Sequence, residues 1–204
     1  MVRYHVWVAV EGYMGDSGPI KPASGLADDP LREESAADAE RRKRRVEGYL
    51  WLLKDKNLNN RWRAAEALGE EHDPASVESL IDALHDPFID VQWIAAKSLG
   101  KIGDPRAVAP LMEALKSENK WLRAGAAWGL GKLHEPRAVE PLLLLLKDTK
   151  KIVRKNTAWA LGSIADKRAV AGLSEALTDD DPEVRGAAQE ALAAIAGKQE
   201  KDKI

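Results

Sequence analysis

A period of 31 residues is the feature that most limits how this chain can fold. Leu-Gly pairs recur at that spacing from Leu68-Gly69 to Leu161-Gly162, and Leu192-Ala193 continues the series. A unit this short cannot bury an apolar face alone, so the period predicts an array in which neighbouring units stack. Other columns keep the same step: Ala65, Ala96, Ala127 and Ala158; Val77, Val108, Val139 and Val170; Leu80, Leu111, Leu142 and Leu173.

Each unit contains two amphipathic helical patterns, which we name A and B. The A pattern is typified by residues 105–115 and the B pattern by residues 88–102, and Gly103-Asp104-Pro105 ends one helix and starts the next. The stripe of the A pattern has the i, i+3, i+4, i+7 spacing of one helix face at Val108, Leu111, Met112 and Leu115. About five such units over residues 44–197 predict an all-α solenoid of about five helix pairs.

The repeat columns resemble the HEAT repeat, and more narrowly its 31-residue subclass of phycobilisome bilin lyases and artificial alpha-repeat binding proteins. The resemblance rests on Val153-Arg154, Ala158, Leu161-Gly162, Ile164 and Arg168-Ala169-Val170. It implies a right-handed α-α superhelix whose B helices line the concave surface. It also implies a ladder of Asp and Arg residues, matched by Asp55/Arg61, Asp148/Arg154 and Asp179/Arg185, with Asp86/Gln92 and Ser117/Arg123 as two incomplete rungs.

The start of the chain lies outside the repeat. Residues 15–30 are rich in Gly and Pro, so we expect residues 1–30 to be a flexible segment, 31–197 the solenoid and 198–204 a charged tail. Residues 2–10 alternate like a strand but have no sheet to pair with. One interpretation is that translation starts at Met14, because codons for residues 10–12 can contain a ribosome-binding sequence; a genuine docking strand is the other.

The basic run at residues 41–45 is interpreted as a solvated helix face. Asp38 and Glu40 lie four residues before Arg42 and Arg44, a spacing that favours ion pairs on a helix. Contact with nucleic acid or an anionic surface is the alternative.

Tryptophan is the main functional signal, with 7 Trp against 3 Tyr and 1 Phe. At about 100° per residue, most of them fall in one narrow arc of the B helices that points away from the A helices. Trp buries a large area at low entropic cost and dominates binding hot spots, so this arc indicates a partner-binding surface. The alternative is that the rings pack on one another and on lysine stems. The candidate binding residues are Trp62, Trp93, Lys97, Lys120, Trp121, Trp128, Lys155 and Trp159.

Charge on this face is uneven. Lysines crowd the middle units, and acidic residues such as Glu66, Glu70, Asp90, Glu183 and Glu190 lie towards the ends. An acidic peptide with apolar anchors fits this pattern. Single-stranded nucleic acid and a planar anionic cofactor also fit chemically. The alternative to any of these ligands is that the lysines are simply solvated and bind no partner.

Several classes of site are disfavoured. The chain has no Cys and a formal net charge of -2, which argues against thiol chemistry, Cys-ligated metals and general nucleic-acid binding. His72 and His134 fall in one loop column two repeats apart, too far to share a metal. HEAT enzymes with paired His-Glu iron motifs are not matched, since His134-Glu135 is a single copy. We therefore expect no catalytic residue, no metal site and no cofactor.

The sequence thus predicts a non-catalytic scaffold that binds a protein or peptide on a groove lined by Trp and Lys. A nucleic-acid-binding module and a lyase-like or chaperone-like subunit acting on a cofactor-bearing protein are the alternatives. We expect a cytoplasmic monomer, because no apolar stretch reaches the roughly 18 to 20 residues of a membrane span. Trp51 and Leu144 share an A-helix column; we expect Trp51 under the N-terminal segment or on the convex surface, and Leu144 is a candidate self-association patch.

Overall fold

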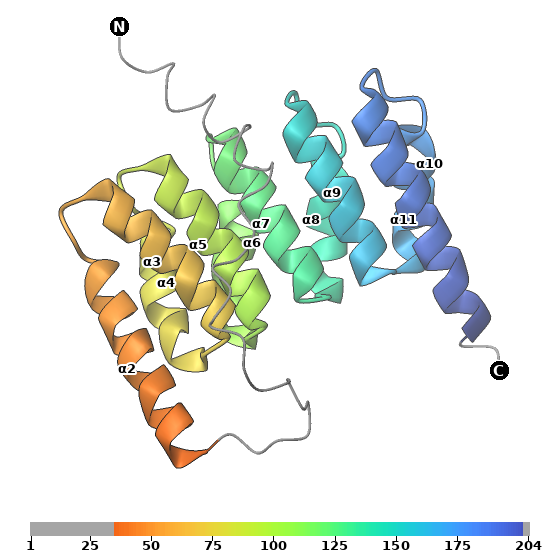
Figure 1. The fold of residues 1–204 in the computed structure, drawn as a ribbon. Helices are drawn as coiled ribbons and strands as arrows, with labels where there is room; N and C mark the ends of the chain where they lie inside the picture. The colour runs from red at the N-terminus through yellow and green to blue at the C-terminus, as the bar shows by residue number, and fades with distance from the viewer. Residues whose placement is uncertain (1–34, 202–204) are drawn as a thin grey trace, which may run out of the picture. The chain divides into compact units, whose positions relative to one another are not determined.

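The computed structural model describes residues 35–201, which are almost entirely helical (Figure 1). They form ten α-helices in five pairs, with no β-strand in the described range. The helices are α2 Ala36–Leu52, α3 Leu58–Glu71, α4 Val77–Ala83, α5 Ile89–Ile102, α6 Val108–Ala114, α7 Lys120–Lys132, α8 Val139–Leu145, α9 Lys151–Ile164, α10 Val170–Ala176 and α11 Pro182–Lys201. The expected all-α solenoid of about five helix pairs is confirmed.

The helices lie in two layers. The B helices α3, α5, α7, α9 and α11 pack side by side in one layer, and α4, α6, α8 and α10 lie behind them (Figure 1). Each of these four A helices follows a short 3-10 turn, such as Pro105–Ala107 before α6. The turn starts there because the Asp104 carboxylate accepts a hydrogen bond from the Arg106 N–H, and Pro105 has no N–H to satisfy.

A continuous core lies between the layers. Its largest members come from the Leu columns that define the period, and each of them is fully buried. Burial of one such side chain contributes about 1.5–3 kcal/mol. The set comprises Leu68, Leu99, Leu130 and Leu161 from the B helices and Leu80, Leu111, Leu142 and Leu173 from the A helices.

The glycine of each Leu-Gly pair allows close packing between B helices. A Cβ on Gly131 would lie 2.7 Å from the Cα of Ala160 on the next B helix. A Cβ on Gly100 would lie 2.5 Å from the Cα of Gly129. Carbon atoms in ordinary contact are about 3.5–4.0 Å apart, so successive B-helix backbones already touch. The period therefore repeats a backbone contact as well as a core side chain.

The B helices α3, α5, α7 and α9 share one way of ending. His72, Gly103, His134 and Ala165 occupy the same repeat column, and all four have a left-handed backbone with φ of 51°, 79°, 50° and 55°. Gly103 was expected to end its helix, and it adopts this conformation without a Cβ penalty. The other three reach it at a cost of about 1–2 kcal/mol each.

The Asp/Arg ladder is present, but its ionic pairs join neighbouring repeats. Arg61 donates to both carboxylate oxygens of Asp86 in the next repeat, at 2.7 and 3.1 Å. In its own repeat, Arg61 donates to two backbone carbonyl oxygens, those of Asp55 at 2.8 Å and Lys56 at 3.2 Å. The same bidentate geometry recurs for Arg123 with Asp148 and for Arg154 with Asp179.

The matching of Asp55 with Arg61, of Asp148 with Arg154 and of Asp179 with Arg185 as ladder pairs is therefore corrected. When the repeats stack, each Arg side chain lies over the Asp of the following repeat. This offset between repeats cannot be derived from residue spacing alone. The number of incomplete rungs is also corrected, because Gln92 and Ser117 face the same interface. That interface, between α5 and α7, lacks an ionic rung, and the other three B-helix interfaces of the described residues have one.

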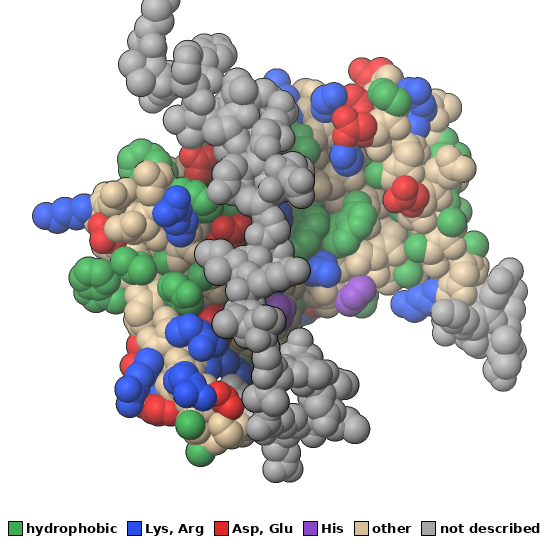
Figure 2. Space-filling model, in the orientation of Figure 1, with side chains coloured by type: hydrophobic (Ala, Val, Ile, Leu, Met, Phe, Trp, Pro, Cys, Tyr) green, Lys and Arg blue, Asp and Glu red, His purple; other side chains and the backbone are tan. Residues whose placement is uncertain are grey.

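The basic run at residues 41–45 lies on α2 and is extensively ion-paired. Arg41 pairs with Asp38, and Arg44 donates to Glu40 at 3.1 Å. Arg45 reaches α3 and contacts both carboxylate oxygens of Glu71, at 2.8 and 3.0 Å. Figure 2 shows the basic side chains gathered over α2 with acidic side chains among them. This arrangement agrees with the interpretation as a solvated, ion-paired helix face.

Some expectations fall outside the described range. The alternating residues 2–10, the proposed start at Met14 and the flexible segment 1–30 all lie before residue 35. Among the described residues, no helix combines the length and apolar character needed to cross a bilayer.

Candidate functional site

The five tryptophans predicted to share a surface all lie on B helices, and all are half-buried. We call this surface the aromatic face and define it by Trp62, Trp93, Trp121, Trp128 and Trp159. Trp62 lies on α3, Trp93 on α5, Trp121 and Trp128 on α7, and Trp159 on α9. Each helix places its ring on the same side because 31 residues bring every B helix back to one orientation.

Two pairs of rings touch across helix boundaries. Trp128 and Trp159 stack with ring centroids 5.6 Å apart and planes only 10° from parallel. Trp93 and Trp121 contact at 6.1 Å with their planes tilted by 59°. The mutual packing that competed with a binding role is therefore present, and it joins α5 to α7 and α7 to α9. Because Trp159 also packs against the core, it stabilises the fold as well as forming surface.

Lysines complete the aromatic face. The Lys97 ammonium lies 4.9 Å from the ring centroid of Trp93 and 5.3 Å from that of Trp128, so it bridges α5 and α7. Lys132 lies 5.6 Å from the Trp128 centroid, and Lys120 lies 5.0 Å from the centroid of Trp121. Cations over indole rings are attracted to the π face, which holds these long side chains in place.

Lys97 is the most perturbed cation on this face. Burial lowers the pKa of its ammonium, and repulsion by Lys101 lowers it further, against opposing effects of Glu66 and Glu70. Of these two carboxylates, Glu70 pairs with Lys101. Lys97 forms no ion pair within the described range, and the aromatic rings replace only part of its lost hydration.

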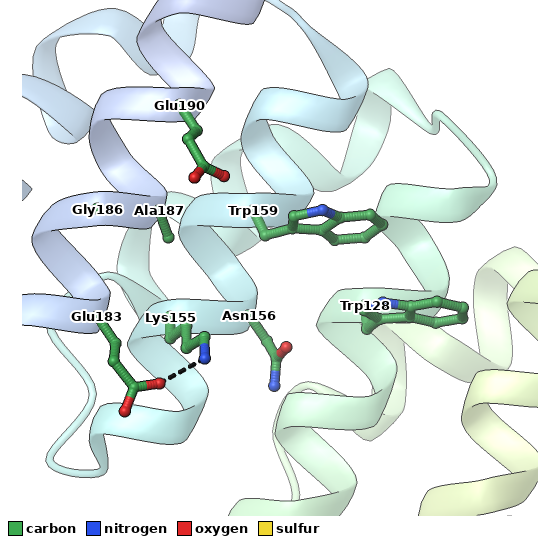
Figure 3. Close-up of a pocket in the computed structure, with 8 residues that line it drawn as sticks. All are labelled: Trp128, Lys155, Asn156, Trp159, Glu183, Gly186, Ala187 and Glu190. Carbon is green, nitrogen blue, oxygen red and sulfur yellow. Dashed lines mark hydrogen bonds and ion pairs between the residues drawn. The ribbon is translucent and has the colours of Figure 1, made fainter. Parts of the chain in front are cut away.

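A hollow of about 370 Å³ opens at the C-terminal end of the face, between α9 and α11 (Figure 3). Trp159 and Trp128 form one side of it, and Glu183 and Glu190 line it from α11. Space exists because Gly186 occupies the repeat column that carries Trp62 and Trp93 on earlier helices, and nothing lies within 4 Å of a Cβ built there.

The candidate residues are not brought together equally. Trp93, Trp121, Trp128, Trp159, Lys97 and Lys120 form one connected cluster over α5, α7 and α9. Trp62 stands apart, with Arg63 5.6 Å from its ring and its indole N–H 3.4 Å from the Asn59 amide oxygen. Lys155 belongs to the hollow, where it forms an ion pair with Glu183 (Figure 3).

The sequence reasoning missed three residues that line the hollow, Asn156, Gly186 and Ala187. A signal for Gly186 was available, because a glycine stands in the column that carries Trp62, Trp93 and Lys155, with Ala124 as its other small residue. Asn156 had no such signal, since its column contains Arg63, Ile94 and Gly125 and follows no chemical pattern.

The described residues contain no group of three His, Asp or Glu side chains arranged to hold a metal. His72 and His134 instead use Nδ1 against backbone carbonyl oxygens, those of Glu70 at 2.8 Å and Ser163 at 2.7 Å. Both histidines therefore have local structural contacts at helix ends.

The opposite side of the solenoid carries the two exposed apolar residues singled out from the sequence. Trp51 on α2 is 71% exposed and Leu144 on α8 is 78% exposed. Leu144 borders a shallow apolar hollow with Met112 and Pro141.

Comparison with known proteins agrees with the repeat geometry. The HEAT repeats family model matches residues 46–122, 77–154 and 108–193, which overlap to cover most of the chain. This chain belongs to the HEAT repeat family. No match was found among curated proteins.

Three solved structures illustrate the likeness. The complex of CpcE and CpcF of phycocyanin lyase from Nostoc sp. PCC7120 has 23% identity and a TM-score of 0.68, covering 89% of this chain and 70% of that one. An engineered protein has 27% identity and a TM-score of 0.61, covering 81% and 85%. A designed armadillo repeat protein in complex with the peptide (KR)4 has 21% identity and a TM-score of 0.56, covering 76% and 86%.

Proposed function

We propose that this HEAT-repeat protein is a non-catalytic scaffold that binds a protein or peptide along its aromatic face. The observation that carries the proposal is the connected run of Trp and Lys side chains over α5, α7 and α9. Large half-buried aromatics with cations over their rings offer both apolar area and charge, the combination found at binding hot spots. Solenoids stack B helices in one layer, so an extended segment meets equivalent positions at regular intervals.

The comparisons support a peptide-binding role only through the likeness in repeat fold. The designed armadillo protein was solved with a bound peptide, so a related solenoid can hold an extended chain. The likeness to the phycocyanin lyase structure supports the alternative function, that of a subunit that acts on a cofactor-bearing protein. We favour the scaffold because the aromatic face offers a partner both aromatic and ionic contacts. Among the described residues, no nucleophile or acid-base pair is assembled on this face.

The proposal is tested by comparing the proteins captured from native lysate by the wild-type chain, by Trp128→Ala and by Trp51→Ala. Chemical cross-linking with quantitative mass spectrometry reads the result, and far-UV circular dichroism confirms that each variant is folded. Partners retained by wild type and by Trp51→Ala are expected to be lost with Trp128→Ala. Trp51 is the matched control, because it is an exposed Trp on α2 outside the aromatic face. Equal capture by all three proteins contradicts the proposal.

A further inference from the structure

The charges of the aromatic face are arranged in zones along the stack. In the centre, Lys97, Lys120 and Lys132 lie over indole rings, and none of them forms an ion pair with a described residue. At the α3 end the face carries Glu66 and Glu70, with Asp90 at the start of α5, and at the α11 end it carries Glu183 and Glu190. Glu70 is paired with Lys101 and Glu183 with Lys155, so the acidic residues that form no ion pair with a described residue are Glu66, Asp90 and Glu190. The order of the uncompensated charges along the stack is therefore acidic, basic, acidic.

The central cations are poised for an anionic partner. Elsewhere on this molecule, buried cations of the ladder meet carboxylates, as Arg61 meets Asp86. Lys97 is half-buried without such a carboxylate, and burial lowers its pKa. An incoming carboxylate would replace the hydration that Lys97 has lost and form a charge-assisted hydrogen bond.

The acidic ends favour a positive charge. Glu190 lines the hollow beside Trp159 and forms no ion pair with a described residue, so a basic side chain there would meet both a carboxylate and an indole. Gly186 leaves room for it, since nothing lies within 4 Å of a Cβ built at that position.

We propose that the occupant of the aromatic face is a short acidic peptide segment with a basic residue at its end. Its carboxylates pair with Lys97 and Lys132, which both lie over the Trp128 ring, and its basic residue enters the hollow beside Trp159 and Glu190. This proposal rests on the scaffold function and names the chemistry of its partner. With helices about 10 Å apart, the stretch from α5 to α9 spans about 20 Å, which an extended chain covers in about six residues.

Nucleic acid fits the same face less well. A strand longer than the basic centre would bring phosphates against Glu66 on one side or Glu190 on the other, the acidic residues at the two ends that form no ion pair with a described residue. One face of Trp128 and one of Trp159 are also turned to each other in the stack, which removes platforms that bases would use.

Synthetic peptides with the full chain test the proposal. The first probe has about nine residues, with Asp, Glu and Leu in the centre and a Lys at each end. The second is its charge-inverted counterpart, and the third is an oligo-dT strand. Affinity is measured by fluorescence anisotropy of labelled probes at about 0.15 M salt. The first peptide is expected to bind at least about tenfold more tightly than the second, equivalent to about 1.4 kcal/mol.

Substitutions assign the two contacts. Lys97→Gln is expected to weaken the first peptide about tenfold, while Lys116→Gln, an exposed lysine paired with Glu113 away from the face, leaves it unchanged. Glu190→Gln should weaken the Lys-ended peptide but not a version with Gly at both ends.

Three results overturn the assignment: equal binding of both peptides, tighter binding of oligo-dT with a steep salt dependence, or no peptide binding at all. If the lysate partners still depend on Trp128 in any of these cases, the scaffold function stands and only the charge assignment falls. If they do not, both proposals fall.

Discussion

Substitution of Gly131 by Ala tests the close approach of the B helices. The new Cβ would lie 2.7 Å from the Cα and 2.9 Å from the Cβ of Ala160, and 2.9 Å from a ring carbon of Trp159. Reaching an ordinary contact of about 3.5–4.0 Å requires α7 and α9 to separate by about 1 Å. Overpacking of this kind costs about 1–3 kcal/mol, because the obstruction is backbone and cannot rotate away.

The matched control is Gly186→Ala, also within a B helix but with nothing inside 4 Å of its Cβ. Both substitutions gain about 0.8–1 kcal/mol of helix propensity. Gly186→Ala is therefore expected to stabilise the protein by up to that amount, and Gly131→Ala to destabilise it by up to about 2 kcal/mol. Because both variants share the propensity gain, they should differ by the overpacking cost of about 1–3 kcal/mol.

Equilibrium unfolding in urea, followed by circular dichroism, measures both changes. Midpoints should move in opposite directions while the dependence of the unfolding free energy on urea stays constant, which indicates that cooperativity is retained. If Gly131→Ala is as stable as Gly186→Ala, the B helices are not held at backbone contact, and our explanation of the Leu-Gly period is wrong.

Two further predictions concern the ladder. Gln92→Arg combined with Ser117→Asp should rebuild the missing rung, giving a favourable coupling of about 1–3 kcal/mol in a double-mutant cycle of urea unfolding; coupling below about 0.5 kcal/mol would show that the geometry there differs. The hydrogen bonds of Arg154 lower the pKa of Asp179 to about 2, below an unfolded value of about 3.9. The resulting stabilisation is complete above about pH 5 and is lost as the pH falls from about 4 to 2. Asp179→Asn should therefore flatten that acid limb by about 1–2 kcal/mol in unfolding measurements across pH, and an unchanged limb would contradict the assignment.

Much of the fold could be predicted because the residues that determine it recur in every repeat. The Leu columns reveal the core, and the Gly103-Asp104-Pro105 segment marks a helix end and the next start, as the structure has it. The ends at His134 and Ala165 could not be read in the same way, since neither is the glycine that usually marks a left-handed residue. Only alignment with the equivalent Gly103 shows that they share its position.

The site divides in a similar way. Periodicity correctly placed Trp128 and Trp159 on one side of the B layer, because helix phase follows from spacing. That their rings stack depends on the offset between α7 and α9, which a linear sequence does not contain. The same offset decides that Arg154 pairs with the carboxylate of Asp179 and reaches Asp148 only at its backbone carbonyl oxygen, so the ladder partners were misassigned for the same physical reason.

The missing rung has a consequence for the order in which the stack comes apart. In a linear array each unit is held only by its neighbours, so every interface has its own sensitivity to conditions. Protonation of Asp148 and Asp179 in acid weakens the α7–α9 and α9–α11 interfaces, because both carboxylates have lowered pKa values and pair with Arg123 and Arg154. The joint between α5 and α7 contains glycine contacts, the Trp93–Trp121 pair and Lys97 over Trp128, with no buried carboxylate to titrate. As the pH falls, the repeats of α9 and α11 should therefore detach before the two repeats of α5 and α7 separate from each other.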